Sequence, residues 1–305
     1  MKTMNLPNLN ETVIAALDFF IKNRPPRLDR SKFRFPLVVA SGNAYHTAQI
    51  VFSGRPAIIA NESNFKQLIA GYKSLIKNKV ISEALVISAS GEKDSVWEVR
   101  LAKKLGLKTV LLTCSPNSSA AAKADKTIAY RKLPEPYTYN VSTYLGMILG
   151  ATGEDPKKIK TAIQKIKLPK NFTSYLAYAF VLPDEMGMVA PMLEIKRHEL
   201  FGAHLSLRAF SAGEARHAKF VNAWDKELVI SLEKNKYFGL PKQRLEINIP
   251  KGTGAGMTMA LSYYLVGLIQ AAKTPYYKKN VENFCQTGPE AYGEDKPFPI
   301  IVPGN

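Results

Sequence analysis

The chain has 305 residues, of which 46% are hydrophobic and 22% charged, as expected for a soluble globular protein with one large or two medium-sized domains. Its formal net charge of +17 indicates a negatively charged partner, either a nucleic acid or a small phosphorylated compound. The two cysteines, Cys114 and Cys285, are too far apart for a zinc-finger pattern and fit reduced thiols in a cytoplasmic protein.

The first half of the chain alternates apolar strands with helices, which predicts a parallel sheet covered on both faces. A leading helix over 11–23 ends at Pro25-Pro26, and a helix over 138–150 closes this half. The strands are expected near 36–41, 56–60, 84–88, 108–113 and 126–129.

The turn inside residues 84–105 carries the most information about function. An apolar strand is followed by Ser88-Ala89-Ser90-Gly91-Glu92-Lys93 and then by a helix with apolar residues at helical spacing. Hydroxyl groups, a lysine charge and the unpaired amides at a helix start can together bind a phosphate group. An ordinary strand-to-helix turn contains the same residue types. The candidate phosphate ligands are Ser88, Ser90, Gly91, Lys93 and Ser95.

The densest lysine run, 155–167, predicts an amphipathic helix with Asp155 as N-cap and Pro156 at its first position. Its lysines therefore form a solvated face. Because no nucleic-acid-binding motif with interleaved aromatic residues is present, nucleic acid is the less favoured partner. The buried stripe of this helix is expected to consist of Ile159, Ile163 and Ile166.

The second half begins near Phe172 and is less regular. Its tail from Gly288 is expected to lie over the surface, and residues 251–256 are interpreted as a flexible turn. The apolar stretch from Met257 to Ile269 is too short to cross a bilayer, and the N-terminus lacks the layout of a secretory signal. Strands are expected at 176–182, 205–210, 227–232 and 244–249, and helices at 187–201, 214–222, 256–272 and 275–284.

Several segments of the first half resemble the sugar-isomerase (SIS) domain. Residues 88–93 resemble the family's phosphate loop, Ser-x-Ser-Gly-Glu-Thr, with Lys93 in place of the threonine. Residues 102–125 resemble the run that follows this loop, 40–48 the first sugar-contacting loop and helix, and 60–62 a strand end. Lysine can bind phosphate as a point charge, so this substitution is compatible with phosphate binding.

The resemblance implies an α/β fold with two SIS-type units in tandem, each a parallel sheet flanked by helices in three layers. The units are expected at 1–153, with the leading helix, and at 154–305, with the tail, in a homodimer. Ser41, Gly42 and Asn43 follow the first strand and should meet the serine turn over one crevice, with Asn43 contacting the sugar. For Asn43, a helix N-cap is an equally good interpretation.

The segment Ala212-Gly213-Glu214-Ala215-Arg216-His217 resembles part of the second SIS domain of glucosamine-6-phosphate synthase-like enzymes and of phosphoglucose/phosphomannose isomerases. In both groups the matching histidine helps to open the sugar ring and is contributed to the site of a neighbouring subunit. The resemblance thus assigns His217 and Glu214 to a catalytic site. The alternative is a first-turn acid and a surface histidine on one helix face.

Aldose–ketose isomerisation needs a base that moves a proton between C1 and C2, and a carboxylate with a raised pKa suits this task. The family's base lies sixteen residues before the histidine, where this chain has Phe201. Glu199 matches if the intervening loop is two residues longer, whereas Glu194 matches the family's Leu-Glu helix start. Glu199 is our candidate base.

The resemblance implies an aldose–ketose isomerase or an amino-sugar-phosphate deaminase or deglycase. It would act on a phosphorylated hexose or hexosamine through an enediol or enamine, without a metal or organic cofactor. The alternative is a non-catalytic sugar-phosphate sensor or regulator, which the displaced glutamate favours. The retained Gly-Glu-x-x-His segment argues against the sensor.

Overall fold

The structure is a computed structural model that describes residues 5–250 and 252–303. The chain forms two compact units, which we name after their sheets. The five-stranded unit comprises Asn23–Leu133 and Thr143–Gly153, and the four-stranded unit comprises Met1–Lys22, Pro134–Ser142 and Glu154–Asn305. The expected boundary between residues 153 and 154 coincides with one junction of the units, whereas residues 1–22 and 134–142 group with the four-stranded unit.

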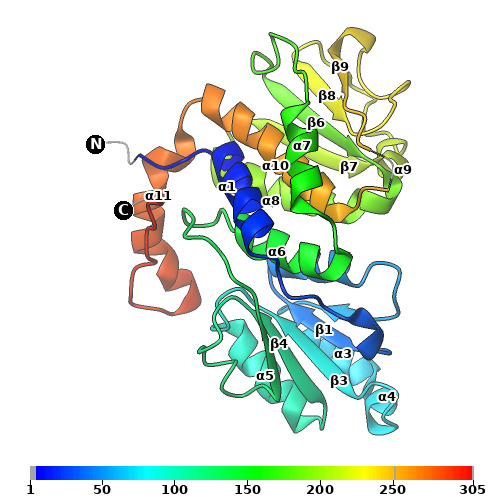
Figure 1. Ribbon diagram of the computed structural model, residues 1–305, viewed down its shortest axis with the longest axis vertical. Helices are drawn as coiled ribbons and strands as arrows, with labels where there is room; N and C mark the ends of the chain where they lie inside the picture. Colours follow the sequence, from blue (N-terminus) through cyan, green and yellow to red (C-terminus); the bar gives the residue numbers. More distant parts are fainter. Residues whose placement is uncertain (1–4, 251, 304–305) are drawn as a thin grey trace. The chain divides into compact units, whose positions relative to one another are not determined.

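The five-stranded unit contains a parallel sheet, as the α/β pattern predicts (Figure 1). The order of its strands is β2-β1-β3-β4-β5. The strand β1, which lies between β2 and β3, is buried along its whole length, and this explains its continuous apolar sequence. It pairs with β2 on one side and with β3 on the other. The strands are β1 (Leu37–Ala40), β2 (Ile58–Ala60), β3 (Glu83–Ile87), β4 (Lys108–Thr113) and β5 (Lys126–Ala129).

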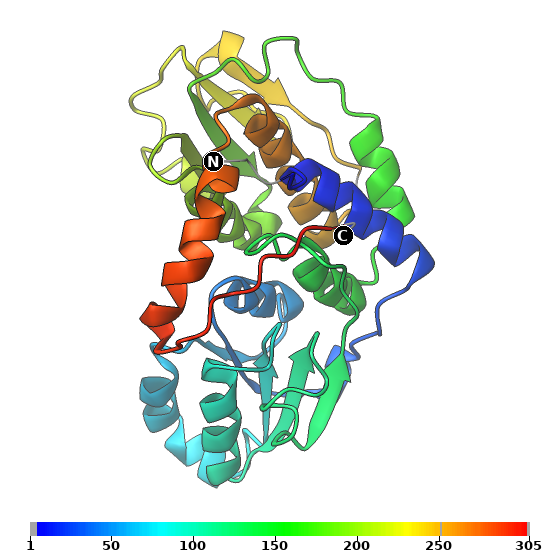
Figure 2. The same cartoon turned by 90° about the vertical axis from the view of Figure 1, so that its left-hand side faces the viewer.

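Helices cover both faces of this sheet (Figure 2). Side chains of α3, α4 and α5 pack on the face that presents Leu37 and Val39, together with the buried ring of Phe65. The helices α2 and α6 lie on the other face. The bounds are α2 (Asn43–Val51), α3 (Phe65–Gly71), α4 (Lys73–Lys77), α5 (Asp94–Lys104) and α6 (Val141–Thr152).

The four-stranded unit repeats this scheme with a parallel sheet in the order β7-β6-β8-β9. In both sheets the first strand of the chain lies between the second and the third. Helix α8 packs against β7, and α10 packs against α8. The elements are β6 (Ala177–Leu182), β7 (Ser206–Ser211), β8 (Glu227–Ser231), β9 (Arg244–Glu246), α1 (Leu9–Lys22), α7 (Pro156–Gln164), α8 (Ala190–Phe201), α10 (Ala255–Ala272) and α11 (Tyr276–Thr287).

The helix predicted over 214–222 is wrong. The element found there, α9 (Ala212–Ala215), has four residues. The chain leaves the helix soon afterwards, and Ala218 adopts a left-handed backbone with φ 57°. Phe220 and Phe238 pack there against the buried cluster of β6 and β8, so aromatic side chains cover a face that a longer helix would otherwise cover.

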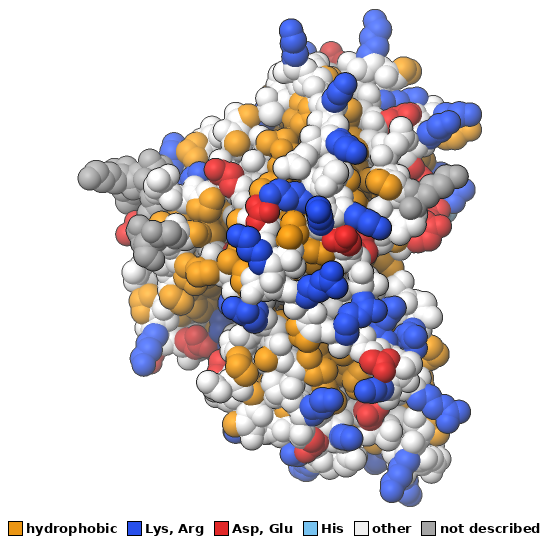
Figure 3. All heavy atoms as spheres, in the orientation of Figure 1, with side chains coloured by type: hydrophobic (Ala, Val, Ile, Leu, Met, Phe, Trp, Pro, Cys, Tyr) orange, Lys and Arg blue, Asp and Glu red, His pale blue; other side chains and the backbone are white. Residues whose placement is uncertain are grey.

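The helix α7 confirms the prediction for the lysine run. The Asp155 side chain accepts a hydrogen bond from the Lys157 amide, and Pro156 occupies the first turn. Ile159 and Ile163 are buried as predicted, whereas Ile166 lies beyond the end of the helix and is half-buried. The lysines face outward except for Lys160, whose Nζ lies 2.5 Å from Asp18 Oδ1. Lysine and arginine side chains are spread over the molecular face in Figure 3.

The start of α10 and the turn before it are hydrogen-bonded to Glu154. The carboxylate of Glu154 accepts hydrogen bonds from the amides of Gly254, Gly256 and Met257 at 2.8–3.0 Å. A negative charge at a helix N-terminus is stabilising, because it meets unpaired amides and the positive end of the helix dipole. Lys251, the first residue of the predicted turn, lies outside the described residues.

Helix α10 is long and apolar enough to cross a membrane, judged by length and composition alone. However, 78% of its apolar window is buried inside the protein. A core helix passes the same test, and α10 packs against α1, α7 and α8.

The close approach of α1 to α10 depends on Gly267. A Cβ atom at this position would overlap the backbone of Asn10. The apolar face of α1, with Leu9, Val13 and Leu17 buried, can therefore reach α10. This contact explains why the leading helix groups with the four-stranded unit.

We expect Gly267→Ala to lower the free energy of unfolding by about 2 kcal/mol, because the new methyl group would push α1 away from α10. The matched control is Gly71→Ala in α3, where a Cβ would meet nothing within 4 Å. That control should raise stability by about 0.5 kcal/mol, since alanine restricts the unfolded chain. Thermal and urea unfolding measure both. Equal stability of the two variants would contradict the packing of α1 on α10.

Candidate functional site

Two sets of side chains carry the candidate chemistry, one in each unit. In the five-stranded unit, the strand order reverses direction between β1 and β3, and ligands of such sheets bind beyond the carboxyl ends of the strands at this point. Ala40 pairs with Ile87 at the ends of these strands. The loops that begin with Ser41 and Ser88 therefore leave the same edge of the sheet, as predicted.

The serine turn holds the hydroxyl groups of the half-buried Ser88 and the exposed Ser90 in place through backbone donors. Ser88 Oγ accepts from the Gly91 amide at 3.1 Å, and Ser90 Oγ accepts from the Glu92 amide at 3.3 Å. Each hydroxyl thus uses an oxygen lone pair inside the turn and can give its hydrogen to a phosphate oxygen. The first amides of α5 point toward the same turn.

Ser95 has a different role from Ser88 and Ser90. It is buried in the first turn of α5, and its hydroxyl donates to the Glu92 carbonyl at 2.7 Å. A phosphate oxygen needs a donor, so Ser95 can bind one only if it releases Glu92. Its assignment as a phosphate ligand stays a prediction.

Gly91 is required by its surroundings. Its φ is +66°, and a Cβ atom would overlap the Ser118 side chain. Its carbonyl accepts from the Ala120 amide at 2.9 Å, and the neighbouring Glu92 carboxylate accepts from the Ser119 amide at 2.8 Å. The segment 118–120 therefore holds Gly91 and Glu92 of the turn in place.

The two loops share an uncommon backbone conformation. Gly42 has φ 56° and ψ −129°, and Lys93 has φ 55° and ψ −125°; each precedes the first residue of a helix. Glycine adopts this region freely, whereas a lysine is strained there. Strain of this kind is found at functional sites.

The loop after β1 presents two buried oxygen atoms. Ser41 Oγ and Asn43 Oδ1 accept no hydrogen bond from the described residues, although both atoms are inaccessible to solvent. Asn43 is the first residue of α2 and does not cap it, so the N-cap interpretation is wrong. Ser41, Gly42 and Asn43 stay predicted substrate ligands.

A buried carboxyl group on α5 was missed by the sequence analysis. Glu98 is 1% exposed, and its Oε1 has no hydrogen-bond partner among the described residues. Burial, together with the nearby charges of Asp94 and Glu62, raises the pKa of Glu98 to about 8. The sequence signal was weak, because a glutamate in a lysine-rich helix is usually exposed.

The four-stranded unit contains a cavity of about 530 Å³ whose wall includes Glu199, the candidate base. The lining comes from the end of α8 and the residues after it, from α11 and from the segment before α6. The lining residues are Tyr137, Thr138, His198, Glu199, Leu200, Phe201, Gly202, Ala203, His204, Tyr276, Tyr277, Asn280, Val281 and Phe284.

Glu199 forms an ion pair with a buried lysine. Lys196 is 0% exposed, and its Nζ lies 2.5 Å from Glu199 Oε2 and 2.6 Å from the Thr138 carbonyl oxygen. Burial raises the pKa of Glu199 above its ordinary value, and the ammonium of Lys196 acts against this shift. A carboxylate with these neighbours at a cavity wall has the properties of a general base.

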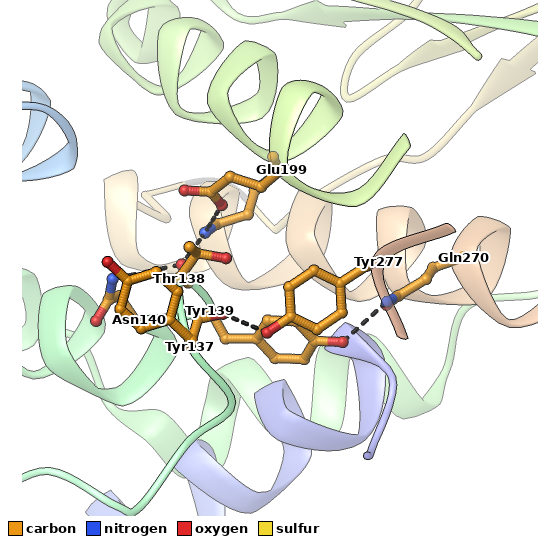
Figure 4. A network of polar contacts seen from close by, with 8 residues as sticks. Tyr137, Thr138, Tyr139, Asn140, Glu199, Gln270 and Tyr277 are labelled. Carbon is orange, nitrogen blue, oxygen red and sulfur yellow. Dashed lines mark hydrogen bonds and ion pairs between the residues drawn. The ribbon is translucent and has the colours of Figure 1, made fainter. Parts of the chain in front are cut away.

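Tyrosines fix the segment that bears Thr138 (Figure 4). Tyr277 donates to the Tyr137 carbonyl at 2.5 Å, and the Tyr139 hydroxyl accepts from Gln270 at 2.8 Å. Thr138 has a φ of 69°, which is rare for a β-branched residue. These bonds keep the strained Thr138 carbonyl next to Lys196.

Two histidines of this cavity were also missed. His204 stacks on the ring of Tyr276 with the centroids 4.1 Å apart, and His198 Nε2 lies 2.7 Å from an Arg197 guanidinium nitrogen. Neither residue belongs to a recognisable sequence motif, because only the fold brings the end of α8 next to α11.

His217 and Glu214 lie elsewhere. The Glu214 carboxylate accepts from the Ser211 amide at 2.9 Å and closes a capping box, while His217 is exposed. Glu199 precedes the amino end of β7 and His217 follows its carboxyl end, so the six residues of β7 separate them by about 20 Å. One chain therefore does not bring Glu199 and His217 together.

Solved structures of sugar-phosphate proteins have a similar fold. A candidate phosphosugar isomerase from Silicibacter pomeroyi is 14% identical with a TM-score of 0.58, covering 87% of this chain and 91% of its own. Glucosamine-6-phosphate deaminase from Thermotoga maritima is 15% identical with a TM-score of 0.57, and the match covers 86% of this chain and 92% of the deaminase. The C-terminal domain of glucosamine-fructose-6-phosphate aminotransferase from Francisella tularensis is 14% identical with a TM-score of 0.57. This match covers 87% of this chain and 93% of the aminotransferase domain.

These similarities show that the α/β fold with two parallel sheets is of the phosphosugar isomerase type. At this level of identity they establish the fold and not the activity. No family model matches the chain, and no curated protein matches it in sequence.

We expect Lys93→Gly to raise the free energy of unfolding by about 1 kcal/mol, because glycine relieves the strained backbone. The matched control, Lys93→Ala, removes the same charge but keeps a Cβ atom. It should not be more stable than the wild type. Chemical denaturation compares the three proteins, and equal stability of the glycine and alanine variants would contradict the strain.

The pKa of Glu98 predicts a pH dependence of stability. The unfolded chain loses the proton near pH 4.5, whereas the folded chain keeps it up to about pH 8. Stability should therefore fall as the pH rises through this range. Glu98→Gln keeps a neutral side chain and should be more stable than the wild type at pH 9.

Unfolding midpoints between pH 5 and 9 measure this effect. The control is Glu290→Gln at an exposed position, which should follow the wild-type profile. A Glu98→Gln profile parallel to that of the wild type would contradict the raised pKa.

Proposed function

We propose that the protein is an enzyme that acts on a phosphorylated hexose or hexosamine, as an aldose–ketose isomerase or as an amino-sugar-phosphate deaminase or deglycase. The observation that carries this proposal is the position of Glu199, a half-buried carboxylate that is paired with a buried lysine at the wall of a cavity of about 530 Å³. The fold of the phosphosugar isomerase type supports the substrate class.

The phosphate group binds the serine turn in this proposal. Ser88 and Ser90 donate hydroxyl hydrogens, Lys93 supplies a positive charge, and the first amides of α5 complete the site. Gly91 permits the tight turn, and Asn43 and Ser41 offer unpartnered oxygens to sugar hydroxyl groups. The net charge of +17 attracts such an anion to the protein.

Glu199 transfers the proton. It takes the proton from the carbon next to the carbonyl group of the opened sugar and returns it to the neighbouring carbon through an enediol. For an amino sugar, the corresponding enamine is reprotonated on the neighbouring carbon to an imine, and water hydrolyses this imine to the sugar phosphate and ammonia or an amine. Burial raises the pKa of Glu199, which makes the carboxylate a stronger base than an exposed one. Lys196 orients the carboxylate.

His217 assists ring opening in a neighbouring subunit of a homodimer. The exposure of His217 and of large apolar side chains that follow it supports this part of the proposal. Val221 is 76% exposed, Trp224 49% and Tyr237 80%, as expected for residues that a second copy covers. The free thiols of Cys114 and Cys285 fit a cytoplasmic location.

A sugar-phosphate sensor is the second candidate function. The short ion pair between Glu199 and Lys196 favours it, because a carboxylate held by an ammonium can also serve structure alone. A sensor would bind the same ligands without turnover.

Replacing Glu199 by glutamine separates the two functions. We expect Glu199→Gln to lower the turnover of the sugar phosphate by at least about 100-fold, since a general base contributes this much or more. Ligand binding should remain, because the phosphate contacts lie on other residues. Thermal-shift titrations with glucose 6-phosphate, fructose 6-phosphate and glucosamine 6-phosphate measure binding, and sugar or ammonia analysis measures turnover.

The matched control is Glu194→Gln on the same helix. Glu194 bonds to the Ala209 amide and to Arg197 and does not line the cavity, so its loss should change stability more than turnover. Full turnover by Glu199→Gln would exclude this residue as the base. A thermal shift of the wild type without turnover would support the sensor.

A further inference from the structure

A second concave surface of the five-stranded unit is lined by three arginines. The cavity has a volume of about 340 Å³, and its wall is formed by the segment before η1 (Arg30–Lys32), by η1 itself, by Arg55 and by the end of α6. The lining residues are Arg27, Leu28, Asp29, Arg30, Ser31, Arg55 and Ala151.

The arginines lie near one another despite their equal charges. Burial lowers the pKa of Arg30, and the positive charges of Arg55 and Arg27 lower it further. The three guanidinium groups are therefore close enough to repel one another. Among the described residues, none of these guanidinium groups forms an ion pair with a carboxylate within 4 Å. A cluster of this kind is stabilised when an anion binds.

Asp29 is the one acidic residue of the wall. Its Oδ1 accepts from the amide and the hydroxyl of Ser31 at 3.1 and 2.5 Å, and its Oδ2 lies 3.9 Å from Lys32. The carboxylate is thus turned toward its own loop. Three arginines and one aspartate give the wall a formal charge of +2, which matches a phosphate group with two negative charges.

Two of the guanidinium groups are fixed by the ends of helices. Arg30 donates to the carbonyl of Val51, the last residue of α2, at 2.9 Å. Arg27 lies against Gly153 after α6, where a Cβ atom would overlap its guanidinium group. Cations are favoured at helix C-termini, so these arginines are held in place before a ligand arrives.

The backbone next to Arg27 packs closely against the last turn of α6. The Leu28 amide donates to the Gly150 carbonyl at 3.0 Å, and a Cβ atom at Gly150 would overlap the Pro26 carbonyl. Glycines at 150 and 153 thus let the arginine-bearing segment lie directly on the last turn of α6.

The arginine cavity is separate from the serine turn. Arg27 and Arg30 precede β1, and Arg55 precedes β2, so these residues lie at the amino edge of the sheet. Ser88 and Ser90 follow β3 and lie at the carboxyl edge. The four residues of β1 span about 13 Å between the two edges.

We propose that the arginine cavity is a second anion-binding site, which takes the dianionic phosphate group of a small phosphate monoester. The volume of the cavity exceeds the size of a phosphate ion and leaves space for the organic part of the ligand. The site does not depend on the proposed sugar chemistry, because it lies at the other edge of the sheet from the serine turn.

The experiment measures this site alone by using a Ser88→Ala/Ser90→Ala background, which weakens the proposed phosphate turn. Isothermal titration with adenosine monophosphate and with inorganic phosphate, at an ionic strength of about 0.15 M, should show binding to this background. Adenosine lacks the phosphate group and should not bind.

Adding Arg27→Gln and Arg55→Gln should weaken the binding of both anions at least about tenfold, since each lost guanidinium removes charged hydrogen bonds. Arg30 is kept because it bonds to Val51. The control is Arg100→Gln/Lys104→Gln, which removes two exposed charges from α5 and should change affinity less than about twofold.

Tighter binding of the monophosphate than of inorganic phosphate identifies a phosphate ester as the ligand, and equal affinities identify free phosphate; both support an anion site. Absence of anion binding to the serine background would overturn the proposal. So would equal weakening by the arginine pair and by the control pair. Thermal unfolding confirms that each variant is folded.

Discussion

A buried ammonium group that must be paired organises the candidate catalytic cavity. Lys196 has no access to water, so its charge needs the Glu199 carboxylate and the Thr138 carbonyl. The second contact holds the strained Thr138 segment, and the bond from Tyr277 to Tyr137 ties the same segment to α11. One ion pair thereby determines both the shape of the cavity and the orientation of the only carboxylate among its described lining residues.

The other two candidate sites, both for anions, lie at opposite edges of a parallel sheet. Helices begin at the carboxyl edge, where amides and hydroxyl groups collect for an anion, and they end at the amino edge, where carbonyls attract arginines. The serine turn and the arginine cavity of the five-stranded unit follow this division. The start of α10 also binds a negative charge, but the charge comes from the protein itself, because the Glu154 carboxylate accepts hydrogen bonds from its amides.

Periodicity and turn chemistry were enough to predict every strand of both sheets, because most of the strands are short apolar runs between turns. They also predicted the serine turn and the helix cap at Asp155. They failed where contacts between distant segments decide the outcome. The docking of α1 depends on the absent side chain of Gly267, and the cavity depends on α8 meeting α11. The burial of Glu98 and Lys196 follows from packing that no local pattern reveals.

Solvent proton exchange at the sugar tests the central claim, which is that Glu199 moves a proton on the carbon skeleton of a phosphorylated sugar. The wild-type protein is incubated in deuterated water with fructose 6-phosphate or glucosamine 6-phosphate, and deuterium at C1 and C2 is followed by NMR. The account predicts incorporation that depends on the protein and stops when Glu199 is replaced by glutamine. Incorporation that continues unchanged in that variant, or none with the wild type, would contradict it.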